Sequence, residues 1–332
     1  MAFRSCPVCD QASDCEGCQM KTIAVLNVDG GTLRTTDLDA FSDHLRRAFE
    51  KQGHEIEVRR VRGAEITEAL QSAADECEVM VVGGGDGTVS AAAGIAWHQG
   101  RVLGVLPAGT MNLFARSLGL PLDINEAATA LAQMNIRPSD IADMDGKTFV
   151  HQFSVGLQPR IVAKRSEIEY NSRIGKIIAS TRAALAVFFH PTWFRGELTV
   201  DGRRIRQGRF AVITVTNNPY GEGHMPYADK LTTGQLGIYW SRPLSTFGSI
   251  RLTKDLLFGS WKRNQDFREE AGDRVKLRFK GKLHHVSASL DGELLEPNNP
   301  TVVTIHPGEL RAIFCPQSEA ADASDKGSAT AA

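Results

Sequence analysis

The chain has 332 residues, 42% of them hydrophobic, which is enough for two domains with ordinary cores. Its formal net charge of −1 excludes the overall positive field that is typical of nucleic-acid-binding proteins, so we expect no nucleic-acid partner. The longest apolar stretch, 177–189, is interrupted by Arg182 and is too short to span a bilayer. The amino terminus has no hydrophobic signal core, so we expect a cytoplasmic protein.

Residues 1–19 form a cysteine-rich leader. Cys6, Cys9, Cys15 and Cys18 are spaced C-x2-C-x5-C-x2-C, which is the ligand count of a structural Zn²⁺ site. The gap between the two pairs is shorter than in common zinc ribbons. Two interpretations stay open, a zinc-binding segment and a disordered segment with reduced cysteines. We expect no disulfides, because the cytosol is reducing.

Strands and helices alternate through residues 20–145. This alternation predicts an α/β domain, doubly wound, with a mostly parallel sheet. The expected strands are 22–28, 55–61, 79–82 and 102–106, and the expected helices are 39–52, 66–74, 89–97, 111–118 and 124–134.

Two glycine-rich turns follow neighbouring strands of this predicted sheet. The first is Gly83-Gly84-Gly85-Asp86-Gly87-Thr88, and the second is Pro107-Ala108-Gly109-Thr110. Such turns lie at the carboxyl ends of parallel strands, where ligands bind, and the helix that follows offers free N–H groups to phosphate. A P-loop sequence is absent, and Thr88 stands where the last glycine of G-x-G-x-x-G would fall. Asp86 is a carboxylate suited to bridge a metal to phosphate or to accept a proton.

Residues 146–316 change to short β-rich runs separated by turn residues. This pattern predicts an antiparallel β-sandwich, with helical excursions at 166–189 and 246–261. The expected strands are 198–200, 209–216, 237–240, 275–279, 285–290 and 301–305. Residues 317–332 are small and polar, which predicts a disordered tail.

The two glycine turns carry a resemblance to a known family. GGGDGT is followed at family spacing by a second segment with matching residues, and together they resemble the diacylglycerol kinase catalytic domain. The matching residues of the second segment are Pro107, Gly109, Thr110, Asn112, Ala115 and Arg116. This family includes bacterial lipid kinases and is similar to sphingosine and ceramide kinases. The resemblance covers 21–316 and implies that the first domain holds ATP and the second the lipid.

The resemblance also implies roles for single residues. The late Asp291-Gly292-Glu293 is similar to the family's D-G-E signature, whose glutamate deprotonates the lipid hydroxyl. Asp86 is the competing base; one of Asp86 and Glu293 acts through Mg²⁺ and the other on the proton, and the sequence leaves open which. Asp140, with Asp143 as the alternative, is the expected further Mg²⁺ ligand before a short hairpin. The implied nucleotide-binding residues are Asn27, Gly31, Gly84, Gly85, Gly87, Thr88, Gly109, Thr110 and Asn112.

Two positions depart from the family pattern. Leu113 stands where many bacterial members have aspartate, and Thr233 stands where an aspartate of a structural magnesium site is usual, beside Asp229. Three functions therefore stay open: a diacylglycerol-type lipid kinase, a kinase for a sphingoid base or NAD, and a catalytically silent lipid- or nucleotide-binding regulator. For the kinase we expect ATP and Mg²⁺ as cofactors, peripheral contact with the membrane that carries the lipid, and a homodimer.

Overall fold

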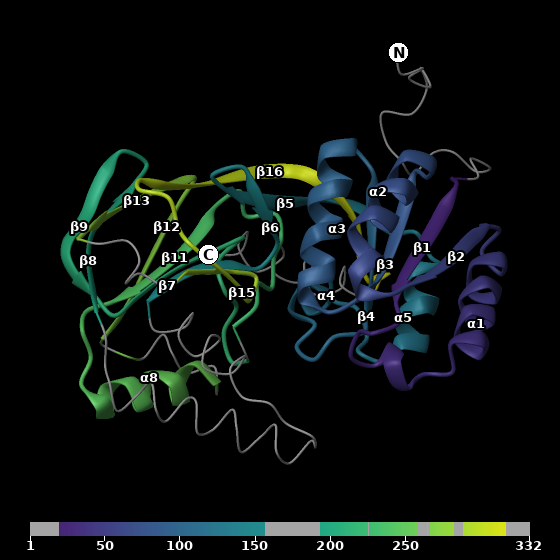
Figure 1. Ribbon diagram of the computed structural model, residues 1–332, viewed down its shortest axis with the longest axis horizontal. Coiled ribbons are helices and arrows are strands. Elements are labelled where there is room, and N and C mark those ends of the chain that lie inside the picture. Colours follow the sequence, from purple (N-terminus) through teal and green to yellow (C-terminus); the bar gives the residue numbers. More distant parts are fainter. Residues whose placement is uncertain are drawn as a thin grey trace, which may run out of the picture.

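Two sheets organise the chain in a computed structural model (Figure 1). The structure describes residues 20–156, 193–224, 226–257, 264, 266–281 and 288–316. A ten-stranded sheet runs through both halves of the molecule, and a six-stranded sheet belongs to the second half. The predicted leader 1–19, the helix at 166–189 and the tail 317–332 lie outside the described residues.

Four parallel strands form the first half of the large sheet, in the order β2-β1-β3-β4. Helices α2 and α3 contact each other, as do α1 and α5, and the two pairs cover the two faces of the sheet (Figure 1). The predicted doubly wound α/β class is confirmed. The elements are β1 (Thr22–Asn27), η1 (Leu33–Thr35), α1 (Leu38–Glu50), β2 (Ile56–Val61), η2 (Gly63–Glu65), α2 (Ile66–Glu76), β3 (Val79–Gly84), α3 (Asp86–Gln99), β4 (Val102–Pro107), α4 (Leu113–Ser117) and α5 (Ile124–Leu131).

Local sequence explains why these elements form where they do. The side chain of Asp37 accepts hydrogen bonds from the N–H groups of Asp39 and Ala40, which caps the start of α1. Phe41, Leu45 and Phe49 recur at helical spacing along α1 and are buried. Strand β3 is buried at every position, as expected for a central parallel strand that helices cover on both sides.

The second half is a sandwich of two antiparallel sheets, as predicted. Its small sheet has the order β12-β11-β10-β7-β14-β15, and it packs on the β13-β8-β9 end of the large sheet. Apolar residues alternate along the strands, so that Phe153 and Ile238 from one sheet share a core with Leu198 and Leu277 from the other. The elements are β5 (Ile136–Met144), β6 (Lys147–Phe149), β7 (Gln152–Gly156), β8 (Phe194–Val200), β9 (Arg203–Phe210), β10 (Val212–Thr216), β11 (Leu236–Ser241), α8 (Thr246–Leu257), β12 (Phe267–Gly272), β13 (Arg274–Lys280), β14 (Ala288–Leu290), β15 (Glu293–Leu295) and β16 (Thr301–Ile313).

Strand β16 joins the two halves, and the sequence did not predict its length. The expected strand ended at Ile305, and the Pro307-Gly308 pair that follows is typical of a turn. Instead a bulge interrupts the pairing between His306 and Leu310, and the strand then continues to pair in parallel with β4 (Figure 1, yellow). One end of β16 belongs to the sandwich core and the other to the α/β core. The domain boundary at 145/146 stays a prediction, and β16, which lies within the predicted second domain, contributes residues to the core of the first.

Helix α8 confirms the start of the predicted 246–261 helix, and residues 258–263 lie outside the described residues. Within the described part of the chain, no helix is both long and apolar enough to cross a membrane.

One histidine, His151, makes stability depend on pH. Its ring is tilted against that of Tyr220, with the ring centroids 5.7 Å apart, and desolvation lowers its pKa to about 4. Because the unfolded chain binds this proton near its ordinary pKa of about 6.5, the unfolded state binds more protons than the folded state between these two values. We therefore expect the free energy of unfolding to fall by about 3 kcal/mol as pH is lowered from 6.5 to 4.

Denaturant unfolding of the wild type and of His151→Phe across this pH range measures the effect. The variant keeps an aromatic ring against Tyr220 but has no proton to bind, so its stability should fall less on acidification. Parallel curves for the two proteins would contradict the assignment.

Candidate active site

At the first glycine motif, strand β3 passes almost directly into helix α3. Gly83 and Gly84 are the last residues of β3, Gly85 is the N-cap of α3, and Asp86 begins the helix. We expected α3 to begin at Val89, three residues later. Gly85 offers no side-chain cap, so the first N–H groups of α3 are left for a ligand. This is the geometry in which a helix start binds phosphate.

The predicted ligand-binding turns meet at the carboxyl edge of the parallel strands. A Cβ placed on Gly109 would lie 2.8 Å from the Cα of Gly85, so the two glycine motifs touch backbone to backbone. The N–H of Thr32, in the turn after β1, donates to the carbonyl of Ala108 at 2.9 Å. Gly31, with φ +24°, packs on the same carbonyl. The structure therefore brings together segments that are up to 80 residues apart in the sequence.

Asp86 is fixed by a backbone group of the second motif. Its Oδ1 accepts the N–H of Leu113 at 3.0 Å, at the start of α4. No partner within the described chain is found for Oδ2, which leaves one carboxylate oxygen for a metal or a proton. Because the donor is the backbone N–H of residue 113, this contact does not depend on the side chain at that position.

Glu293 lies against the start of α3. A Cβ on Gly87 would be 2.8 Å from its Oε1, so the carboxylate lies where a side chain at position 87 would begin. Glu293 is exposed and begins β15, directly after the tight turn at Asp291 and Gly292, where φ is +45° and +88°. The structure thus brings the predicted base from the far end of the chain to the predicted phosphate-binding helix start.

Asp291 holds this hairpin in place. Its carboxylate accepts three backbone N–H groups, from Val150, His151 and Gln152, at 2.7–3.0 Å. The hydroxyl of Ser90 on α3 donates to it as well. Burial raises the pKa of Asp291, and these four donors act in the opposite direction by favouring the charged form. A partly buried carboxylate from the second half is therefore tied to a helix of the first half.

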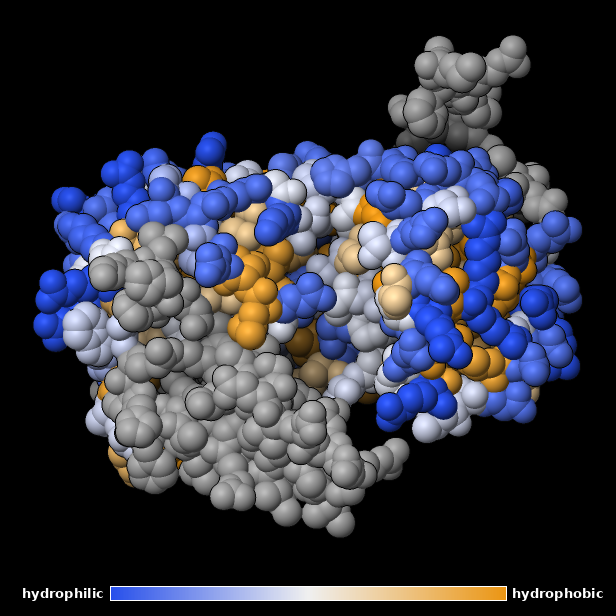
Figure 2. All heavy atoms as spheres, viewed as in Figure 1, coloured by the Kyte–Doolittle hydropathy of each residue, from blue (hydrophilic) through white to orange (hydrophobic). Residues whose placement is uncertain are grey.

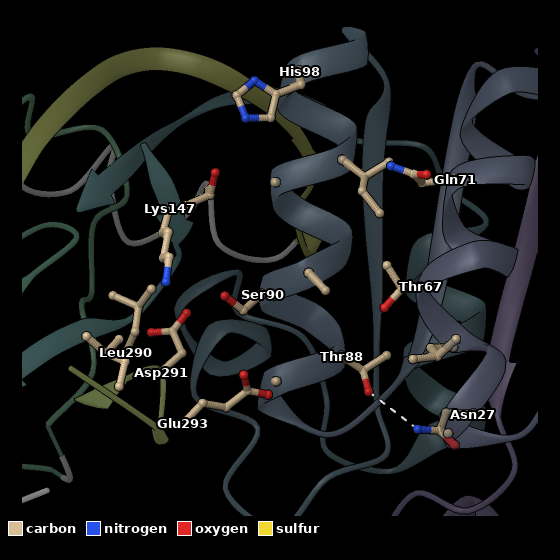
Figure 3. A pocket seen from close by; sticks show the side chains of 18 of the residues that line it. Asn27, Thr67, Gln71, Thr88, Ser90, His98, Lys147, Leu290, Asp291 and Glu293 are labelled. Atoms are coloured by element: carbon tan, nitrogen blue, oxygen red, sulfur yellow. Dashed lines mark hydrogen bonds between the residues drawn. The ribbon is translucent and has the colours of Figure 1, made fainter. Parts of the chain in front are cut away.

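A cavity of about 740 Å³ lies beside α3 and includes Glu293 (Figure 3). On one side it is bounded by the turn after β1 and the start of α2, and on the other by β6 and the β14–β15 hairpin. The residues that line it include Asn27, Thr67, Gln71, Gly87, Thr88, Ser90, His98, Lys147, Thr148, Leu290, Asp291, Glu293, Leu294 and Leu295. Figure 2 shows a hollow at this position, with hydrophobic side chains on the side of the β-rich half.

The remaining predicted nucleotide-binding residues differ in what their side chains do. Asn27 and Thr88 line the cavity and are 3.5 Å apart at Nδ2 and Oγ1. Asn112 is engaged within its own turn, where Oδ1 accepts the N–H of Gly109 at 2.8 Å and Nδ2 donates to the carbonyl of Gly109 at 3.2 Å. It therefore shapes the turn. Thr110 is exposed beside it.

Asp140 does not lie in this cavity. It is 2% exposed, in the middle of β5, and both of its carboxylate oxygens are already hydrogen-bonded to backbone. Oδ2 accepts the N–H of Gly234 at 2.7 Å, and Oδ1 accepts the N–H of Gly308 at 2.9 Å. We therefore replace the Mg²⁺-ligand interpretation of Asp140 by a structural one. Its alternative, Asp143, bonds to His306 at 2.8 Å.

The loop in which a second magnesium site was in doubt is closed by hydrogen bonds. Thr233 donates from its N–H and its hydroxyl to Oδ1 of Asn218, at 3.0 and 2.7 Å. Asp229 pairs with His224 at 2.8 Å. In the described part of the chain, no three His, Cys, Asp or Glu side chains gather as a metal site would need. The predicted zinc ligands Cys6, Cys9, Cys15 and Cys18 lie outside that part.

Sequence reasoning missed two groups of cavity residues. Gly63, Ile66 and Thr67 follow β2, whose carboxyl end lies at the same edge as those of β1 and β3, and this signal could have found them. Lys147 and Thr148 come from a three-residue strand that carries no motif. Lys147 extends into the cavity on the side of Asp291 (Figure 3).

Comparison with known proteins agrees with this geometry. Residues 21–144 match the family model of the diacylglycerol kinase catalytic domain. A diacylglycerol kinase of Bacillus subtilis is 27% identical over 277 residues, which cover 78% of this chain and 87% of that protein. A probable lipid kinase YegS-like of Pseudomonas aeruginosa is 40% identical over 90 residues, 26% of this chain and 30% of that protein.

The fold has a match among solved structures. The crystal structure of a diacylglycerol kinase from Bacillus anthracis aligns with a TM-score of 0.67 at 19% identity and covers 90% of this chain and 98% of that one. The resemblance found in the sequence is thereby confirmed.

The structural role of Asp140 is testable through stability. Asp140→Ala removes the buried acceptor of two backbone N–H groups, those of Gly234 and Gly308, so we expect the free energy of unfolding to fall by about 3 kcal/mol. The exposed Asp43→Ala should change it by less than about 0.5 kcal/mol. Urea unfolding measures both. A rise of the wild-type midpoint on adding Mg²⁺ that Asp140→Ala abolishes would contradict the structural role and restore the metal interpretation.

Proposed function

We propose that this chain, a phosphotransferase of the diacylglycerol kinase family, transfers the γ-phosphoryl group of ATP to the hydroxyl of diacylglycerol or a closely related lipid. One observation carries the proposal: Glu293 touches Gly87 at the start of α3, in a cavity that both halves of the chain line. A proton acceptor and a phosphate-binding helix start are thus placed together, as phosphoryl transfer to an alcohol requires.

The nucleotide would occupy the side of the cavity formed by the α/β half. The uncapped start of α3 supplies N–H groups for the phosphates, with Thr88 in the same turn. Ile66 and Thr67, together with Ala91 on α3, line a partly apolar recess that suits an adenine ring. Asn112 and Gly109 support the arrangement by holding the second turn against Gly85.

The lipid would enter from the β-rich side. Leu290, Leu294 and Leu295 line the cavity around Glu293, and Leu294 is 47% exposed. An apolar wall next to the proton acceptor favours an acceptor with acyl chains. It disfavours NAD, which is polar along its whole length. A sphingoid base shares the apolar chain and stays the alternative acceptor.

The chemistry divides between two carboxylates. Glu293 takes the proton of the lipid hydroxyl as its oxygen bonds to the γ-phosphorus and the bond from the γ-phosphorus to ADP breaks. Asp86, held by the N–H of Leu113, has one oxygen with no partner among the described residues, which fits a metal shared with the phosphates. Mg²⁺ there would neutralise phosphate charge as it develops.

The catalytic roles are tested by ³²P transfer from ATP to micellar diacylglycerol, sphingosine and NAD. Glu293→Gln should lower kcat by 100-fold or more, because the lost group is a general base. Asp86→Asn should lower kcat and raise the Mg²⁺ concentration needed for half-maximal rate. The matched control Glu296→Gln, an exposed carboxylate three residues after Glu293, should keep wild-type activity.

Three results would alter the proposal. A Glu293→Gln enzyme within threefold of wild type would remove Glu293 as the base. Labelled NAD would assign the chain another acceptor. Binding of ATP with no transfer to any acceptor would support a catalytically silent regulator. The homodimer and the membrane contact stay predictions.

We further propose that Lys147 contacts the nucleotide phosphates. It is the lysine on the cavity wall, and no carboxylate within the described residues lies within ion-pair distance of it. Lys147→Met should raise KM for ATP about tenfold with a smaller change in kcat, since it removes a charge that binds phosphate in both ground and transition states. Steady-state kinetics with Lys51→Met, an exposed lysine at the end of α1, as control measure this. An unchanged KM would overturn the assignment.

A further inference from the structure

The outer face of the β13-β8-β9 sheet is strongly basic. The inward residues of these strands, such as Leu198 and Leu277, are fully buried in the sandwich core. The residues between them point to the other side of the sheet, because side chains alternate along a strand. This outer face carries Lys276, Arg278, Lys280, Arg195, Arg204 and Arg209, against a single acid, Glu197. We call these six cations the basic face.

The strand register places like charges directly side by side. Lys280 pairs with Arg195, and Arg195 pairs with Arg209, so that three cations form one row across three strands. Like charges in directly opposed positions destabilise a sheet. None of the three has an ion-pair partner within the described part of the chain. This cost, in a chain of net charge −1, needs an external anion to explain it.

A tryptophan lies beside this row. Trp193 is 46% exposed, and the guanidinium groups of Arg209 and Arg195 lie 4.3 and 5.8 Å from its ring centroid. An exposed indole beside arginines combines an apolar body with cations, which is the composition that places tryptophan at membrane–water interfaces. The Trp193 ring is therefore an apolar contact next to an anion-binding row.

We propose that the basic face docks the protein on a bilayer that carries anionic lipid headgroups. Three adjacent strands present these cations on one face of a sheet, which suits a layer of headgroups, and the exposed Trp193 lies on the same side as Arg195 and Arg209. Attraction of several Lys and Arg side chains to an anionic leaflet is additive and is screened by salt. Duplex nucleic acid is the competing polyanion, and the test includes it.

The test measures vesicle binding without any chemistry. The full chain is sedimented with phosphatidylcholine vesicles and with vesicles that contain 30 mol% phosphatidylglycerol, in the absence of ATP. Arg195→Glu/Arg209→Glu is compared with Arg47→Glu/Lys51→Glu, which makes the same change in net charge on exposed residues of α1, at the opposite end of the molecule (Figure 1). Trp193→Ala tests the aromatic contact.

The wild type should bind the anionic vesicles at least tenfold more tightly than the neutral ones, and added salt should weaken this binding. The Arg195/Arg209 variant should lose at least tenfold in affinity, Trp193→Ala should lose severalfold, and the α1 variant should bind within twofold of wild type. Thermal unfolding checks that the variants fold, and Arg195→Gln/Arg209→Gln replaces the charge reversal if that variant does not.

Equal loss in the Arg195/Arg209 and α1 variants would show a net-charge effect and overturn the proposal. So would wild-type binding that does not depend on phosphatidylglycerol, or tighter binding to duplex DNA than to vesicles. Because the proposed lipid substrate is a bilayer component, the surface extends the proposed function. Failure of the docking proposal can be distinguished from failure of the proposed kinase function. Transfer to a lipid in neutral detergent micelles should be unaffected in the Arg195/Arg209 variant.

Discussion

The carboxylate of Asp140 is the point on which the two halves of the molecule depend. A buried charge is tolerated when hydrogen bonds satisfy it, and Asp140 receives the N–H groups of Gly234 and Gly308. Gly308 lies in the bulge of β16, with φ +68°. By fixing this bulge, Asp140 lets one strand leave the sandwich core and enter the α/β core. Strand β6 pairs with β5, the strand that carries Asp140. The position of β5 therefore also sets the position of Lys147 and Thr148 on the cavity wall.

The two acids of the D-G-E segment have different roles: Asp291 fixes the hairpin, and Glu293 is the proposed proton acceptor. Asp291 is partly buried, accepts backbone N–H groups of residues 150–152, and accepts the hydroxyl of Ser90 on α3. Glu293, two residues later, is exposed in the cavity. Gly292, with φ +88°, provides the turn between the two acids. The hydrogen bonds of Asp291 fix the hairpin, which places the carboxylate of Glu293 where it can exchange a proton.

The sequence predicted what depends on near neighbours. The four strands of the first half follow from local apolar runs, so GGGDGT and the P-x-G-T turn could be placed at one edge of a sheet, although the start of α3 was placed three residues too late. The resemblance added Glu293. What was missed depends on distant pairing: Pro307-Gly308 is typical of a turn until Asp140 is seen to hold it as a bulge. Likewise, the cations of β8, β9 and β13 are unremarkable in sequence, and the strand register alone gathers them into a face.

The two departures from the family pattern become less damaging once the atoms that make the contacts are known. At Leu113 the contact to Asp86 comes from the backbone N–H, which every residue except proline supplies. At Thr233 the N–H and hydroxyl both reach Asn218, so this loop is closed by groups of the chain itself. A catalytically silent protein was kept open because these two side chains lack a carboxylate. Both positions still make defined contacts. The case for a catalytically silent protein therefore rests only on the absence of negative charge at Leu113 and Thr233. The Asp86 oxygen that has no partner among the described residues and the exposed Glu293 weigh against it.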